Sequence, residues 1–129
     1  MMKIMAYESD FTHLWTRYGS LHGHDVHVRL LGELGKSFEA RTPELVHELT
    51  RFFPLNNIKP YNLGESPDEA DFYFVGGSKE EALAVLPVLP RGKAFWVTDN
   101  EVGLESTAAE RRYATCRGQE ITKIIEEMF

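Results

Sequence analysis

The sequence predicts a single three-layer α/β domain over residues 1–129, built on a mostly parallel sheet of four or five strands. Two observations lead to this prediction. Short apolar runs that suit buried strands alternate with segments in which apolar residues recur at helical spacing. Capping residues and glycines mark the boundaries of several helical segments. Alternation of this kind sets strands side by side in parallel and covers both faces of the sheet with helices.

The first half of the chain shows this alternation from its start. "MKIMAY" has the apolar run of a buried strand, and Ser9 or Asp10 can cap the helix that follows. Gly23 supplies a stop for that helix, whereas Gly32 and Gly35 predict a loose segment. The predicted elements are a strand over 2–7, a helix over 11–21, a strand over 25–31, a helix over 42–53 and a short strand over 58–62.

The second half continues the pattern. "SKEEALAVLPVLP" opens with a capping box, Ser78 with Glu81, and Pro87 limits the helix. The segment "EITKII" near the end of the chain is interpreted as a final strand. The predicted elements are a strand over 71–77, a helix from 78, a strand over 93–99, a helix over 106–116 and a strand over 120–125.

Composition excludes several classes of function. The net charge of −6 argues against a nucleic-acid backbone as the main partner, because such proteins usually carry a basic face. No run of about 18 apolar residues occurs, and the first residues lack the pattern of a signal peptide, so no membrane partner is expected. The one cysteine, Cys116, rules out an intramolecular disulfide and favours a cytoplasmic setting.

The stretch "LHGHDVHVRLLGEL" has two interpretations. It resembles the zinc-binding segment of the 6-pyruvoyl-tetrahydropterin synthase family, and His13, His22 and His24 then supply three imidazoles for a catalytic zinc. In the other interpretation a helix ends, Gly23 caps it, and a strand begins near Asp25. That pattern is common in Rossmann-like sheets, including glycosyltransferases with two such domains. The helical spacing before Gly23 favours the second interpretation, and no metal is predicted there.

The stretch "KAFWVTDNEVGLESTAAERRYATCRGQEI" carries the most specific pattern. It has a strand, a loop with Ser106 and Thr107, and Glu110 in the first turn of a helix. This order resembles the nucleoside 2-deoxyribosyltransferase superfamily, which includes deoxynucleotide N-hydrolases. "MKIMAY" is similar to the first strand of that superfamily, whose aromatic end residue is Tyr7 here. The resemblance implies a three-layer Rossmann-like or flavodoxin-like fold.

The resemblance also implies a reaction and a site. Glu110 matches the catalytic glutamate, a nucleophile that cleaves an N-glycosidic bond or transfers the deoxyribosyl group, and Asp99 is a candidate acid that assists departure of the base. The candidate substrate-binding residues are Tyr7, Glu8, Glu101, Ser106 and Thr107. A nucleoside or nucleotide is the expected partner, no cofactor is expected, and sites shared between subunits in that superfamily imply a homodimer.

Other interpretations of these residues stay open. Thr107 and Glu110 form a capping-box pattern, in which the glutamate serves only the helix start. "VGGS", which opens a helix, can cradle a phosphate, and acids after the strands can hold magnesium. The chain as a whole can also be a non-catalytic nucleotide- or sugar-binding or protein-interaction module, resembling the N-terminal domain of a glycosyltransferase.

Overall fold

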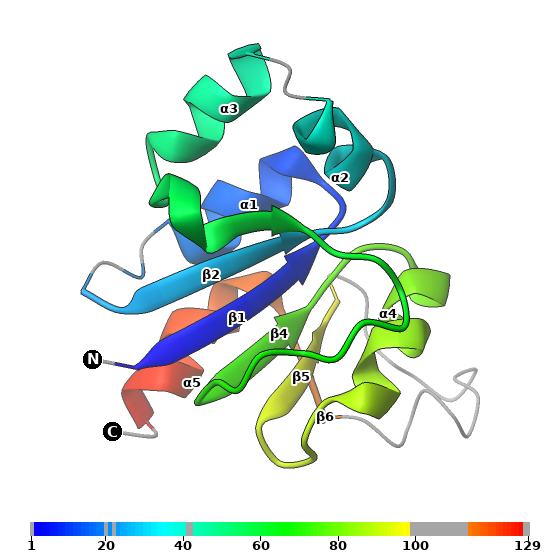
Figure 1. Ribbon diagram of the computed structural model, residues 1–129. Helices are drawn as coiled ribbons and strands as arrows, with labels where there is room; N and C mark the ends of the chain where they lie inside the picture. Colours follow the sequence, from blue (N-terminus) through cyan, green and yellow to red (C-terminus); the bar gives the residue numbers. More distant parts are fainter. Residues whose placement is uncertain (1, 20, 22, 41–42, 99–113, 128–129) are drawn as a thin grey trace.

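The computed structural model describes residues 2–19, 21, 23–40, 43–98 and 114–127. Within them, six strands form one sheet in which every neighbouring pair is parallel (Figure 1). The strands are β1 (Lys3–Glu8), β2 (Asp25–Leu30), β3 (Ile58–Pro60), β4 (Phe72–Val75), β5 (Ala94–Val97) and β6 (Ala114–Cys116). The α/β class is therefore confirmed, with six strands instead of four or five.

The strands lie in the order β3-β2-β1-β4-β5-β6, which is the order of Rossmann dinucleotide-binding sheets. The chain moves outward from β1 through β2 to β3, and it then returns to the other side of β1 to form β4. The centre of the sheet is thus the junction of β1 and β4, where the direction of winding reverses.

Helices cover both faces of the sheet because side chains of a strand alternate between faces. One core cluster joins Ile4 and Ala6 of β1 to α1 and α5, and the other joins Met5 and Tyr7 to α4. Figure 1 shows α1 and α5 behind the sheet and α4 in front of it. The helices are α1 (Phe11–Tyr18), α2 (Gly32–Glu39), α3 (Pro43–Thr50), α4 (Lys79–Val85) and α5 (Ile121–Glu127), with short 3-10 turns at η1 (Leu55–Asn57), η2 (Leu86–Val88) and η4 (Gly118–Glu120).

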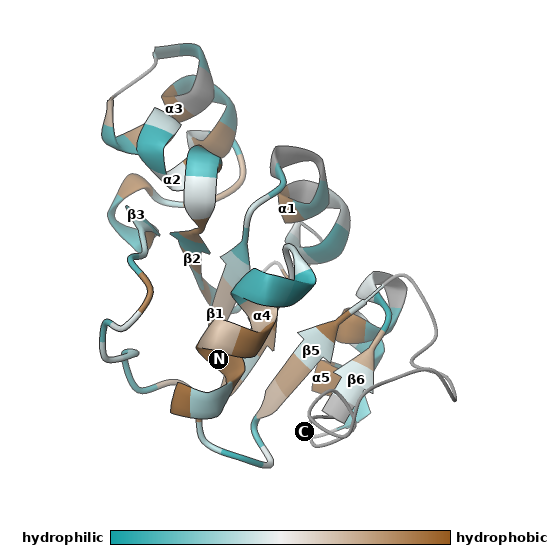
Figure 2. Cartoon of the chain, turned by 90° about the vertical axis from the view of Figure 1, so that its right-hand side faces the viewer, coloured by the Kyte–Doolittle hydropathy of each residue, from teal (hydrophilic) through white to brown (hydrophobic). Residues whose placement is uncertain are grey.

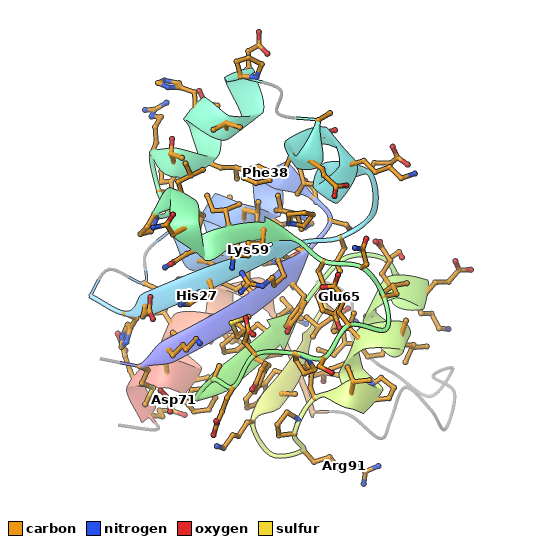
Figure 3. The ribbon with its side chains drawn as sticks, in the orientation of Figure 1. His27, Phe38, Lys59, Glu65, Asp71 and Arg91 are labelled. Atoms are coloured by element: carbon orange, nitrogen blue, oxygen red, sulfur yellow. The ribbon has the colours of Figure 1, made fainter. Side chains whose placement is uncertain are left out.

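The crossover from β3 to β4 runs in front of the sheet without a helix (Figure 1). Three polar contacts anchor it. Arg29 Nη2 donates to Asp68 Oδ2 at 2.8 Å, the Tyr73 hydroxyl donates to the Asp68 carbonyl at 2.8 Å, and that hydroxyl accepts from the Ala70 amide at 2.8 Å. Figure 3 shows His27 and Lys59 on the same front of the sheet. Side-chain contacts from β2 and β4 thus hold a segment that has no regular structure of its own.

The segment after β2 differs from its predicted loose structure, because Gly32–Glu39 forms helix α2. A Cβ at Gly35 would lie 2.6 Å from the Leu30 carbonyl oxygen and 3.5 Å from Pro60. Glycine here therefore lets the helix pack closely on the strands, a gain that outweighs its low helix propensity.

The end of the chain also differs from the prediction. Residues 114–116, predicted as helix, form β6, and most of 120–125, predicted as a strand, lies in helix α5 (Ile121–Glu127). Ile121 and Ile125 are buried four residues apart, which is the spacing of a helix face. Cys116 is buried in β6, where burial raises the pKa of its thiol to about 12, consistent with an unreactive core residue.

No helix among the described residues is long and apolar enough to cross a membrane.

Candidate functional site at the carboxyl edge of the sheet

The carboxyl ends of β1 and β4 are neighbours at the centre of the sheet, with Tyr7 paired to Val75. β1 leads into α1 on one face, and β4 leads into α4 on the other. In open parallel sheets, ligands bind in the crevice beyond the strand ends at such a reversal. The residues at and after the ends of the two strands, 8–10 and 76–78, are therefore the first candidates for the site.

Glu8, the last residue of β1, is fully buried and bonded to α1. Its Oε1 accepts hydrogen bonds from Arg17 Nη1 at 2.6 Å and from the Tyr18 hydroxyl at 2.8 Å. Burial raises the pKa of Glu8, and the Arg17 guanidinium opposes that rise. Because a buried carboxylate is costly without a counter-charge, Arg17 offsets that cost and fixes α1 over the strand end.

Two glycines make room for this buried pair. A Cβ at Gly76 would lie 2.3 Å from both carboxylate oxygens of Glu8, and a Cβ at Gly118 would lie 2.8 Å from Arg17 Cγ. Glu8 Oε2 is buried and has no hydrogen-bond partner among the described residues. Glu8, which was predicted to bind substrate, is therefore buried beneath Gly76 at this edge of the sheet.

Tyr7, the other β1 residue predicted to bind substrate, lies on the opposite face of the sheet. Its ring packs edge-on against Tyr61, with the ring centroids 5.0 Å apart. Its hydroxyl is buried and has no hydrogen-bond partner among the described residues, and burial raises the pKa of Tyr7. The structure thus places Tyr7 in the core under Tyr61 and α4.

Glu81 connects the start of α4, which follows β4, with the start of α2, which follows β2. Ser78 and Glu81 form the predicted capping box: Ser78 Oγ accepts from the Glu81 amide at 3.2 Å, and Glu81 Oε1 accepts from the Ser78 amide at 3.3 Å. Glu81 Oε2 then lies 2.9 Å from the position that a Cβ on Gly32 would occupy. The carboxylate therefore extends from the first turn of α4 to the start of α2, above the end of β1. Figure 2 views this edge and shows the hydrophilic first turn of α4.

A cavity of about 290 Å³ lies beside Glu81. One wall is a face of α2 that includes Gly32, Gly35, Lys36 and Glu39, and the other wall is the segment after β3. The lining as a whole is Leu31, Gly32, Gly35, Lys36, Glu39, Pro60, Tyr61, Asn62, Leu63 and Glu81. The size of this cavity, and its lining of apolar residues with a few polar groups, suit a single ring system or a monosaccharide.

A second, larger space of about 940 Å³ lies between α2 and α3 alongside β3. Its lining is mostly apolar and includes Phe38, Val46, Leu55 and Ile58. Figure 3 shows Phe38 between the two helices. This groove is larger than the cavity beside Glu81, but no residue of α4, the helix that follows β4, lines it, whereas Glu81 in the first turn of α4 lines the smaller cavity. We therefore place the candidate site at the smaller cavity.

Five of the predicted site residues lie outside the described residues: Asp99, Glu101, Ser106, Thr107 and Glu110. The structure does show where the strand before them ends. β5 finishes at Val97, on the same edge of the sheet as the ends of β1 and β4.

His24 directly precedes β2 and His27 lies in its first half, whereas His13 lies in α1. His24 Nδ1 accepts from the Met2 amide at 3.4 Å, and His27 Nε2 lies 2.9 Å from Asp25 Oδ2. No group of three His, Cys, Asp or Glu side chains suited to a metal occurs among the described residues, to which His22 does not belong. Helix α1 (Phe11–Tyr18) forms in the segment whose helical spacing favoured a helix, ended by Gly23, over the zinc site.

Comparison of the chain with protein-family models, curated proteins and solved structures finds no match. Sequence reasoning missed Arg17 and the contact of Glu81 with Gly32. Arg17 occupies the apolar spacing of α1 between Leu14 and Tyr18, and that position is the one signal that predicts its burial. The contact between Glu81 and Gly32 joins distant segments and has no local signal.

Proposed function

We propose that this chain binds a small, hydroxyl-bearing ligand of the nucleoside class at the carboxyl edge of its sheet. The observation that carries the proposal is the cavity beside Glu81, next to the point where the winding of a Rossmann-like sheet reverses. Ligands of parallel α/β sheets gather at this position because loops from both halves of the sheet meet there.

The charges of the edge favour a neutral nucleoside over a nucleotide. Rossmann sheets that bind pyrophosphate have a glycine-rich turn after the first strand. Here that turn is Glu8, Ser9 and Asp10, with one carboxylate buried and one exposed. Glu39 and Glu81 line the cavity with a single lysine, Lys36. Carboxylates accept hydrogen bonds from hydroxyl and amino groups and repel phosphate.

For the reaction, we propose cleavage of an N-glycosidic bond, or transfer of the deoxyribosyl group, with Glu110 as the nucleophile and Asp99 as the acid. Support comes from the sequence resemblance together with the end of β5 at this edge. A carboxylate next to the anomeric carbon stabilises the positive charge that develops as the base departs.

A non-catalytic binding module is the second candidate. Support for it comes from the enclosure of Glu8, the carboxylate at the end of β1, by Arg17, Tyr18 and Gly76, which gives Glu8 a role in holding the fold together.

One experiment separates the two candidates. Purified protein is assayed for thermal shift and for release of free base with a panel of ribo- and deoxyribonucleosides and their monophosphates. Binding with base release that Glu110→Gln abolishes supports the enzyme, and binding without release supports the module. Absence of binding across the panel contradicts both.

A further inference from the structure

Within the proposed nucleoside site, the geometry points to a specificity-determining residue: we infer that Glu81 Oε2 accepts a hydrogen bond from the exocyclic amino group of the base. The inference rests on the proposed function and adds to it a class of base, the bases with an exocyclic amino group (cytosine, adenine and guanine).

The two oxygens of Glu81 have different surroundings. Oε1 accepts from the Ser78 amide in the capping box, which fixes the direction of the carboxylate. Oε2 lies 2.9 Å from the position that a Cβ on Gly32 would occupy, and Glu81 is part of the cavity lining. Side chains fixed by a second contact bind a ligand with less loss of conformational freedom. The capping box therefore holds an acceptor in the cavity.

The other polar groups of the cavity include further acceptors. Asn62 Nδ2 donates one of its two N–H groups to Glu65 Oε1 at 3.0 Å, and the carbonyl oxygen of this amide is an acceptor. Glu39 adds a carboxylate to the wall formed by α2. Lys36 Nζ, the one cationic group in the lining, lies 3.2 Å from Glu33 Oε1. A cavity rich in acceptors matches a ligand that presents donors.

The shape of the cavity suits a planar ring. Gly32 and Gly35 present backbone without side chains on the α2 wall, and Pro60 and Leu63 face the space from the segment after β3. A cavity of this size, lined by apolar residues and a few acceptors, is suited to a base whose amino group meets one of those acceptors. Cytosine and uracil have the same size but differ in this group, an amine in one and a carbonyl in the other. Glu81 therefore favours cytidine over uridine.

The test measures the affinity of cytidine and uridine, by calorimetry, for the full chain and for Glu81→Gln. Glutamine keeps the capping box but replaces the Oε2 acceptor by an amide that donates when its oxygen faces Ser78. We expect the full chain to bind cytidine roughly 10- to 100-fold more tightly than uridine, the size of a lost hydrogen bond to a charged group. Glu81→Gln is expected to remove or reverse that preference, whereas the exposed neighbour variant Glu80→Gln leaves it unchanged.

A second variant, Leu63→Trp, tests the location without altering α4. Leu63 is 57% exposed at the cavity, so a larger side chain there obstructs the opening without entering the core. It is expected to weaken cytidine and uridine equally. Equal affinity of the full chain for both nucleosides, or an equal loss of both in Glu81→Gln, overturns the inference and leaves the proposed function intact. No binding of either nucleoside overturns both.

Discussion

Arg17 Nη1 donates to Glu8 Oε1 at 2.6 Å, and the two side chains are 6% and 0% exposed. This pair joins the first helix to the end of the first strand, directly beneath the edge where we place the ligand site. Gly76 after β4 and Gly118 after β6 lie against it. Four segments distant in sequence thus depend on one buried ion pair.

Removal of Arg17 is expected to destabilise the fold strongly. Arg17→Met keeps an unbranched side chain but leaves the Glu8 carboxylate buried without a counter-charge. We expect the free energy of unfolding, measured in urea, to fall by about 3–5 kcal/mol. The matched control is Lys36→Met, at an exposed pair with Glu33, with a change below about 0.5 kcal/mol. A loss below about 1 kcal/mol in Arg17→Met would show that water compensates the Glu8 charge.

The raised pKa of Glu8 predicts that the stability of the fold depends on pH, and it fixes the direction of that dependence. Between the ordinary value of 4.5 and the raised value in the fold, the folded state binds more protons than the unfolded state. The stability of the native chain relative to Glu8→Gln is therefore expected to fall as pH rises from 4.5 through that window. Urea unfolding of both proteins at several pH values measures the difference. A difference that grows in favour of the native chain over the same window would contradict the direction of the shift.

Gly76 is expected to be intolerant of a side chain because of Glu8. Gly76→Ala puts a methyl group against the carboxylate and is expected to cost about 1–3 kcal/mol of unfolding free energy, as overpacking does. Glu8→Asp withdraws the carboxylate by one methylene, so the cost of Gly76→Ala is smaller in that background. A double-mutant cycle measures this coupling.

Gly23 provides the control for that cycle. A Cβ at Gly23 meets nothing within 4 Å, and its φ of +85° makes alanine strained for backbone reasons alone. Gly23→Ala and Glu8→Asp are therefore expected to be additive. Additive effects of Gly76→Ala and Glu8→Asp would instead show that Gly76 is required for some other reason.

Two buried tyrosines are expected to respond in opposite ways to loss of the hydroxyl. The Tyr73 hydroxyl contacts the Asp68 carbonyl and the Ala70 amide, whereas that of Tyr7 is buried without a partner among the described residues. Tyr73→Phe is expected to lower the unfolding free energy by about 1–3 kcal/mol. Tyr7→Phe is expected to leave it unchanged or raise it by up to about 1 kcal/mol. A large loss in Tyr7→Phe would indicate a buried water bonded to that hydroxyl.

The sequence was sufficient to predict the fold class because buried parallel strands are apolar on both faces. Five of the strand positions were predicted to within a few residues for this reason, from "MKIMAY" to "KAFWVTD". The end of the chain was assigned incorrectly because isoleucine and threonine favour strands locally. Helix α5 forms because Ile121 and Ile125 pack together on the sheet, and this tertiary gain overrides local preference.

The candidate site was less predictable because its contacts link distant segments. The capping box of Ser78 and Glu81 was correctly predicted from local spacing. The position of Glu81 beside Gly32 depends on helix α2. The sequence did not predict that helix, because Gly32 and Gly35 indicated a loose segment. The buried pair of Glu8 and Arg17 depends on Gly76 and Gly118, and its one local signal is the position of Arg17 in the apolar spacing of α1.

The most direct test of the central claim is to map where a nucleoside binds, with ¹H–¹⁵N NMR of the labelled chain titrated with unlabelled cytidine. We predict that the amide shifts gather around Gly32, Asn62 and Glu81 at the carboxyl edge. Shifts that gather at Gly23 on the amino edge, or at Val46 in the groove between α2 and α3, would contradict a ligand site at the cavity beside Glu81.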